Sequence, residues 1–168
     1  MVSSPFRPLD VLTVLVDHGV RFVLIGGLAG RAWGSPLVTG DTDVAYARDD
    51  RNLERLADAL NELDARLRGV EDDVPFLLDA MTLRAGSNFT FATRAGDVDI
   101  FGTVAGIDDF DQLWSAADEV DVRGMPVRVA VVSDLIEMKR AAGRPKDIAA
   151  LEVLGALEEE RAKWRGVE

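Results

Sequence analysis

Cysteine is absent from the 168-residue chain, which excludes disulfide bonds and metal sites built on thiolates. Histidine occurs once, as His18 at the end of a predicted helix, where we expect a capping cation rather than a metal ligand. No apolar run approaches the roughly 18 residues that a membrane-spanning helix needs. The segment from Met1 to Pro8 has no signal pattern, so the cytoplasm is the expected location and no membrane partner is expected.

Positive charge is outnumbered, since 19 lysines and arginines against 30 acids give a formal net charge of −11. A strongly acidic surface repels phosphate backbones, which argues against generic coating of nucleic acid. The exception is the segment from Asp121 to Lys146, which has six bases against three acids and follows a stretch with eight acids and no base. This basic strip could contact a phosphorylated substrate, or it could be a solvated helix face.

Apolar spacing predicts an α/β (α+β) fold, with a mixed sheet of about five strands flanked by helices. The expected helices cover residues 9–19, 28–33, 50–68, 110–117, 133–142 and 146 onward. The expected strands cover residues 21–25, 43–47, 89–93, 98–101 and 127–132, and residues 76–83 fit either type. Ser133 is the predicted N-cap of its helix. We expect one domain over residues 1–168, in which 133–168 form a C-terminal helical portion whose tail, 158–168, frays.

Two carboxylates stand two residues apart at the start of a predicted strand, Asp41 and Asp43. Alternate strand residues point the same way, so both should project from one face, where their mutual repulsion favours a cation between them. Oxygen ligands of this kind select Mg²⁺ or Mn²⁺. The strands over 89–93 and 98–101 are expected to form a hairpin across Arg94-Ala95-Gly96. Asp97 and Asp99 offer a third ligand from the second strand of this hairpin, and Asp99 is preferred because it lies between Val98 and Ile100. A chance turn-forming Asp-x-Asp pair is the alternative.

A glycine pair, Gly26-Gly27, follows a predicted strand and precedes a helix. Without side chains, its backbone N–H groups could approach a phosphate, although a simple tight turn would use the same residues. Thr39, two residues before Asp41, could donate its hydroxyl to a terminal phosphate oxygen, or it could bond its own backbone.

Together, Gly26-Gly27, Thr39-Gly40-Asp41-Thr42-Asp43, Val98-Asp99-Ile100 and the late Lys139…Arg144-Pro145-Lys146-Asp147 resemble the DNA polymerase β-like nucleotidyltransferase superfamily. Within it, the chain looks most similar to the AbiEii-type group of toxins from bacterial toxin–antitoxin systems. The resemblance implies the nucleotidyltransferase fold and an enzyme that transfers NMP from a nucleoside triphosphate to a hydroxyl, with release of pyrophosphate.

The resemblance also implies roles for the motif residues. Asp41, Asp43 and Asp99 would be catalytic metal ligands, and Lys139 would neutralise phosphate charge. The nucleotide would be held by Gly26, Gly27, Thr39, Lys139, Lys146 and Asp147. Family members often carry an arginine where this chain has Leu37, so Arg31 or Arg48 could substitute for it.

The acceptor is open to several interpretations. The resemblance implies the 3′ end of tRNA, with a cognate antitoxin protein as partner. Related small enzymes instead modify a protein or an antibiotic, and a third alternative is a non-catalytic module that binds nucleotides.

Overall fold

The computed structural model describes residues 4–71 and 73–165. They form a seven-stranded mixed sheet in the order β3-β4-β5-β2-β1-β7-β6. The strands are β1 (Phe22–Ile25), β2 (Asp41–Tyr46), β3 (Arg66–Leu67), β4 (Asn88–Thr93), β5 (Gly96–Phe101), β6 (Asp118–Val122) and β7 (Met125–Val129). The helices are α1 (Pro8–Asp17), α2 (Gly26–Ala32), α3 (Asp50–Glu62), α4 (Ala80–Ala85), α5 (Phe110–Ala116), α6 (Val132–Ala142) and α7 (Asp147–Arg165).

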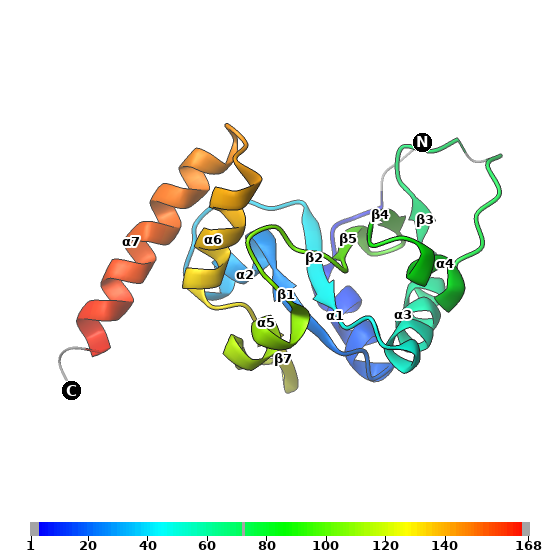
Figure 1. The fold of residues 1–168 in the computed structure, drawn as a ribbon, viewed down its shortest axis with the longest axis horizontal. Helices are drawn as coiled ribbons and strands as arrows, with labels where there is room; N and C mark the ends of the chain where they lie inside the picture. Colours follow the sequence, from blue (N-terminus) through cyan, green and yellow to red (C-terminus); the bar gives the residue numbers. More distant parts are fainter. Residues whose placement is uncertain (1–3, 72, 166–168) are drawn as a thin grey trace.

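The centre of the sheet combines parallel and antiparallel pairing. β2 is antiparallel to β1 and parallel to β5, while β1 is parallel to β7. Hairpins extend both edges, because β4 is antiparallel to β5 and β6 to β7. In Figure 1, α6 and α7 lie together at one end of the molecule and α3 and α4 at the other. The predicted mixed α/β fold is confirmed, with seven strands where about five were expected.

The two unexpected strands have little apolar periodicity. β6 reads Asp-Glu-Val-Asp-Val and lies at the sheet edge, so its strand form depends on pairing with β7 rather than on a buried face. β3 is only two residues long and was predicted as the end of the preceding helix. Both strands exist because of tertiary pairing, which local sequence pattern does not encode.

The predicted helix over residues 50–68 was too long, since α3 ends at Glu62. Asp64 takes the left-handed conformation with φ 53°, and Ala65 N donates to Leu60 O while Asp64 N donates to Asn61 O. These bonds form a Schellman motif, in which the residue with positive φ is usually glycine. Because aspartate rather than glycine occupies this position, the sequence does not indicate the end of the helix. The residues that follow were therefore predicted to be helical.

Two boundaries of the C-terminal helices also differ from the predictions. Ser133 is not the N-cap of α6, because the helix begins at Val132 and Val131 occupies the cap position without a side-chain hydrogen bond. The carbonyl of Val131 accepts from Asp134 N and Leu135 N, which closes the first turn one residue earlier. The predicted fraying tail is helical as far as Arg165, and residues 166–168 lie outside the described part of the chain.

The core lies on both sides of the sheet's centre. The leucines at helical spacing along α3 are buried, with Leu53, Leu56 and Leu60 fully inaccessible, and α3 packs against α1. β1 is a short apolar run and is buried along its whole length, in agreement with the strand predicted over 21–25. No helix among the described residues has the length and apolarity needed to cross a membrane.

Through its side chain, Asn52 connects α3 to the backbone next to the start of β1 and the end of β2. Its side chain, 3% exposed, accepts from Arg21 N at 2.7 Å and donates to Ala47 O at 2.7 Å and Arg21 O at 3.1 Å. Asn52→Ala removes all three bonds and takes these partners from Arg21 N and Ala47 O, while Arg21 O still accepts from Ala47 N, so we expect a loss of about 2–4 kcal/mol in the free energy of unfolding. Urea denaturation measures it, and a loss under about 0.5 kcal/mol, typical of a surface substitution, would contradict this role.

Candidate active site

Three carboxylates meet where β2 and β5 run side by side. The parallel register pairs Asp41 with Asp97 and Asp43 with Asp99. Alternation along β2 buries Thr42 and Val44 on the other face and leaves Asp41 and Asp43 partly exposed. One carboxylate oxygen each from Asp41, Asp43 and Asp99 lies within 4.8 Å of the others.

Of the two candidates for the third acid, the structure groups Asp99 with the pair. The side chain of Asp99 is 14% exposed, whereas that of Asp97 is 47% exposed. Asp97 lies two residues nearer the start of β5. The flanking Val98 and Ile100 are fully buried, so the alternation that suggested Asp99 from sequence is present in the fold.

The electrostatics of this cluster suit the binding of a cation. Burial, followed by the charges of Asp41 and Asp99, raises the pKa of Asp43 to about 7. Asp43 Oδ1 is buried and has no hydrogen-bond partner among the described residues. An orphaned carboxylate oxygen facing two further carboxylates matches the hard, all-oxygen ligand set of Mg²⁺ or Mn²⁺.

The pKa of Asp43 gives a pH prediction for the metal-free protein. A carboxyl with a raised folded-state pKa stabilises the fold below its usual pKa near 4, and this stabilisation is lost as the pH rises through about 7. We expect the unfolding free energy in EDTA to fall by on the order of 4 kcal/mol between pH 4 and pH 8 from this group. Urea titrations across that range test it. The Asp43→Asn variant should have a shallower pH profile, and identical profiles would contradict the assignment.

The glycine pair begins α2 and lies against the carboxylate cluster. Gly26 has φ 68°, and a Cβ built there would overlap Asp43 Oδ2 and lie 2.9 Å from its Cγ. A Cβ on Gly27 would lie 2.7 Å from Thr39 Oγ1. The pair therefore keeps α2 close to both the carboxylates and Thr39. The Thr39 hydroxyl is 3.4 Å from Asp41 Oδ1, within the same group.

The late basic residues form an opposite wall. Lys139 on α6 lies 3.2 Å from Asp147 Oδ1, and Arg144 Nε lies 2.9 Å from Asp147 Oδ2. Burial raises the pKa of Asp147, but hydrogen bonds from Arg144 and Lys139 outweigh it and hold the pKa below its usual range. The Asp147 carboxylate, 3% exposed, is thus engaged by two bases, and the charge of Lys139 also acts on Asp43.

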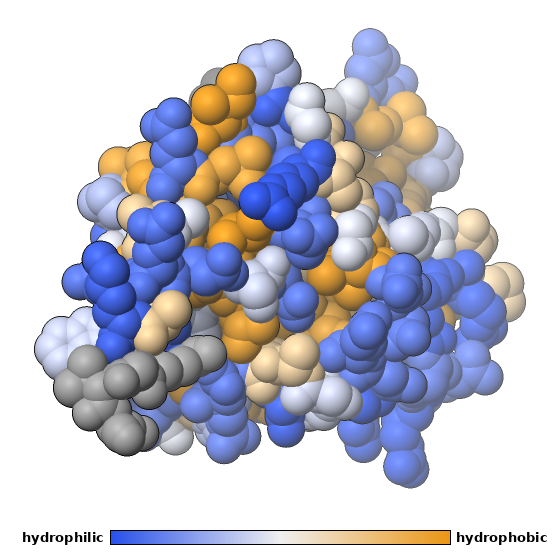
Figure 2. Space-filling view, turned by 60° about the vertical axis from the view of Figure 1, so that its left-hand side comes forward, coloured by the Kyte–Doolittle hydropathy of each residue, from blue (hydrophilic) through white to orange (hydrophobic). Residues whose placement is uncertain are grey.

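A cavity of about 540 Å³ connects these walls. It is lined by the predicted site residues Gly26, Gly27, Thr39, Asp41, Asp43, Asp99, Lys139, Lys146 and Asp147, and by residues of α7 such as Ala150 and Leu154. An apolar recess of about 130 Å³, between Phe101, Leu135 and Met138, opens beside Asp43. On the side of α6 and α7, Figure 2 shows exposed apolar side chains in a band bordered by hydrophilic ones.

Arg68 completes the site and was missed by sequence reasoning. Its Nη1 lies 2.9 Å from Asp99 Oδ1 and 3.6 Å from Asp97 Oδ2, and it lines the cavity. The mistaken extension of α3 placed Arg68 on a helix. The residues expected to substitute for the family's arginine bind elsewhere, since Arg31 donates to Leu37 O and Arg48 to Arg84 O.

The basic strip does not form one surface. The guanidinium of Arg128 stacks on Trp114, Arg123 lies in the β6–β7 turn, and Arg140 pairs with Glu137. Of its six bases, Lys139, Arg144 and Lys146 line the cavity.

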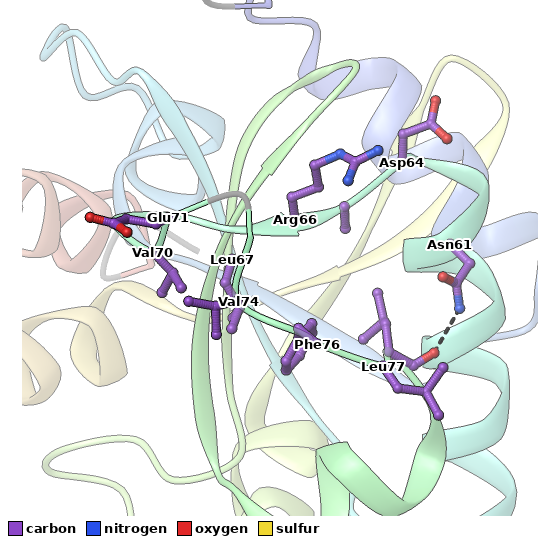
Figure 3. A pocket seen from close by; sticks show the side chains of 11 residues that line it. Asn61, Asp64, Arg66, Leu67, Val70, Glu71, Val74, Phe76 and Leu77 are labelled. Atoms are coloured by element: carbon purple, nitrogen blue, oxygen red, sulfur yellow. Dashed lines mark hydrogen bonds between the residues drawn. The ribbon is translucent and has the colours of Figure 1, made fainter.

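A second cavity, of about 300 Å³, lies beside β3 and contains no predicted site residue. Figure 3 shows Arg66, Leu67, Phe76 and Leu77 around it, with Asn61 donating to Leu78 O at 2.8 Å. Arg66 therefore lines this cavity, whereas Arg68, only two residues later, lines the cavity that contains the carboxylates.

Neither a protein-family model nor a curated protein matches the chain. Solved structures do. The lincosamide adenylyltransferase LnuA, in its lincomycin-bound form, has a TM-score of 0.60 at 11% identity, over 92% of this chain and 99% of LnuA. ANT(2″)-Ia in complex with adenylyl-2″-tobramycin has a TM-score of 0.57 at 15% identity, over 95% of both chains. An antigenic nucleotidyltransferase-like protein from Paracoccidioides brasiliensis has a TM-score of 0.51 at 14% identity, over 92% of this chain and 78% of its own.

These likenesses extend over nearly the whole chain and share one architecture. At such low identity they show the fold rather than the substrates. The chain has the nucleotidyltransferase fold.

Proposed function

We propose that the protein is a metal-dependent nucleotidyltransferase, which transfers NMP from a nucleoside triphosphate to a hydroxyl group. The observation that carries the proposal is the cluster of Asp41, Asp43 and Asp99, whose ligand oxygens lie within 4.8 Å of one another beneath a glycine pair. The orphaned Asp43 Oδ1 and the raised pKa of Asp43 support a cation at this place.

The proposed roles follow from position in the cavity. Asp41, Asp43 and Asp99 would hold Mg²⁺ or Mn²⁺, which when bound supplies positive charge to the triphosphate. Gly26 and Gly27 leave room for phosphate oxygens near the carboxylates, and Thr39 can donate its hydroxyl to one of them. Lys139, oriented by the buried Asp147, would neutralise phosphate charge.

In the proposed reaction the acceptor oxygen attacks the α-phosphorus. The bond between that phosphorus and the β-phosphate oxygen breaks, so pyrophosphate leaves. The acceptor's proton passes to a carboxylate, for which Asp99, the third acid of the cluster, is the candidate. The apolar recess beside Asp43 offers space for an uncharged part of the nucleotide or the acceptor.

For the acceptor, we propose a hydroxyl of a small molecule. The basic residues that could have held RNA are dispersed, and the net charge of −11 repels a polyanion. The structural neighbours include a lincomycin-bound enzyme and a complex with adenylylated tobramycin. Transfer to the tRNA 3′ end, as a toxin with an antitoxin partner, is the alternative that the AbiEii-type resemblance favours.

A transfer assay separates these alternatives. The protein is incubated with each α-labelled nucleoside triphosphate and Mg²⁺, and with an aminoglycoside–lincosamide panel, total tRNA or cell protein as acceptor. We expect label on a small molecule together with pyrophosphate release. Label on tRNA would replace the proposed acceptor by the toxin alternative, and label on protein by an antitoxin-type activity. Nucleotide binding without turnover on any acceptor would favour a non-catalytic module.

A further inference from the structure

Arg68 contacts the carboxylate cluster from the side of the β3–α4 connection, where no other described residue forms an ion pair with it. Its guanidinium contacts Asp99 at 2.9 Å and Asp97 at 3.6 Å. Its charge also acts on Asp43. A guanidinium in this place neutralises part of the charge that a divalent cation would neutralise, and it uses the same carboxylate.

The backbone of Arg68 is fixed while its side chain is not enclosed. Arg68 N donates to Thr90 O at 2.9 Å, which attaches the residue to β4 beyond the last pair of β3. The side chain is 34% exposed, and a weaker bond at 3.3 Å joins Nη1 to Phe91 O. The guanidinium can therefore change partners by side-chain rotation alone, without any movement of the sheet.

Two other partners are within its reach. Asp97, in register with Asp41 and half-exposed, already lies near Nη1. The cavity that Arg68 lines also contains Gly27 and Lys139, where the proposed triphosphate would lie. Guanidinium groups pair with phosphate oxygens in a bidentate manner, which compensates for a lost carboxylate.

We infer that Arg68 is an internal counter-ion of the metal site, which holds Asp99 while no metal is bound and competes with the divalent cation for that carboxylate. When nucleotide and metal bind together, Arg68 exchanges Asp99 for triphosphate oxygens. The free protein thus binds metal weakly, and the nucleotide strengthens metal binding. The inference rests on the proposed function, because it assumes that the carboxylates receive a metal and the cavity a triphosphate.

The test measures Mn²⁺ binding by electron paramagnetic resonance, with and without a non-hydrolysable nucleoside triphosphate. Without nucleotide, Arg68→Gln should bind Mn²⁺ at least about tenfold more tightly than the wild type, because one positive charge next to the site is removed. Addition of the nucleotide should strengthen Mn²⁺ binding by a larger factor in the wild type than in Arg68→Gln.

Two further variants separate charge from structure. Arg68→Lys keeps the charge and should bind Mn²⁺ like the wild type. Arg66→Gln removes an arginine from the neighbouring cavity wall and should also leave Mn²⁺ binding unchanged. Equal or weaker Mn²⁺ binding by Arg68→Gln, with nucleotide-dependent binding intact in the wild type, would overturn this inference alone. Absence of Mn²⁺ binding in every variant, even with nucleotide, would overturn the proposed function as well.

Discussion

Asp41→Asn is expected to lower the rate of nucleotidyl transfer by at least about a thousandfold, and to remove Mg²⁺-dependent binding of the nucleotide. Asp41 is one of the three clustered carboxylates, and the amide removes a formal charge from the proposed metal site. Loss of charge stabilisation at a reacting phosphate costs several kcal/mol of transition-state free energy, which corresponds to this factor. Single-turnover transfer and calorimetric titration with Mg²⁺ and nucleotide measure the two effects.

A matched control separates this effect from a general change in charge. Asp118→Asn also converts an aspartate on a strand to asparagine, but Asp118 is exposed on edge strand β6 and does not line the cavity. We expect its transfer rate to stay within about twofold of the wild type. Comparable losses in both variants, or full activity of Asp41→Asn, would contradict the metal-site assignment.

Gly26→Ala is expected to weaken nucleotide-dependent metal binding and to lower the free energy of unfolding. It is the second-largest effect that we expect. The added Cβ would overlap Asp43 Oδ2, and alanine is strained at φ 68°. The backbone strain costs about 1–2 kcal/mol, and the displacement of Asp43 should add a similar amount. Because Asp43 must move, we expect nucleotide-dependent Mn²⁺ binding to weaken by at least about tenfold.

Gly124→Ala provides the comparison for Gly26→Ala. Gly124 lies in the β6–β7 turn with φ 86°, and nothing lies within 4 Å of its added Cβ. The strain of a positive φ is common to both variants, so the difference between them reports the contact with Asp43. Equal stability losses and unchanged Mn²⁺ binding in both variants would show that the close approach of Gly26 to Asp43 has no functional role.

Much of the fold could be predicted because its central elements follow local rules. β1 is a continuous apolar run, and the leucine stripe of α3 has helical spacing and a side-chain cap from Asp49. The β4–β5 hairpin was predicted from the Arg94-Ala95-Gly96 turn. Elements that depend on a distant partner, such as β6 against β7, have no equivalent local signal.

The geometry of the carboxylates was predictable for a similar reason. Alternation along a strand places Asp41 and Asp43 on one face wherever β2 lies in the sheet. The parallel pairing that sets Asp43 opposite Asp99 depends on how β2 and β5 come together in the tertiary structure. The choice between Asp97 and Asp99 therefore needed the structure. Charge clustering along the sequence was a poor guide, because Arg128 and Lys139 belong to different elements and serve different contacts.

Arg68 shows most clearly what sequence pattern could not supply. Its position depends on the turn at Asp64, where aspartate adopts a conformation that usually indicates glycine. Once α3 ends there, Arg68 follows β3 beside β4, and its side chain reaches Asp99 on β5, the next strand of the sheet. An error of six residues in a helix boundary therefore concealed the arginine that contacts Asp99 in the carboxylate cluster.

The most direct test is a crystal structure of the protein with Mn²⁺ and a non-hydrolysable nucleoside triphosphate. The proposed function predicts an anomalous peak about 2.1 Å from carboxylate oxygens of Asp41 and Asp43, with the triphosphate between Gly26-Gly27 and Lys139. An empty carboxylate cluster in crystals that hold the nucleotide elsewhere would contradict it.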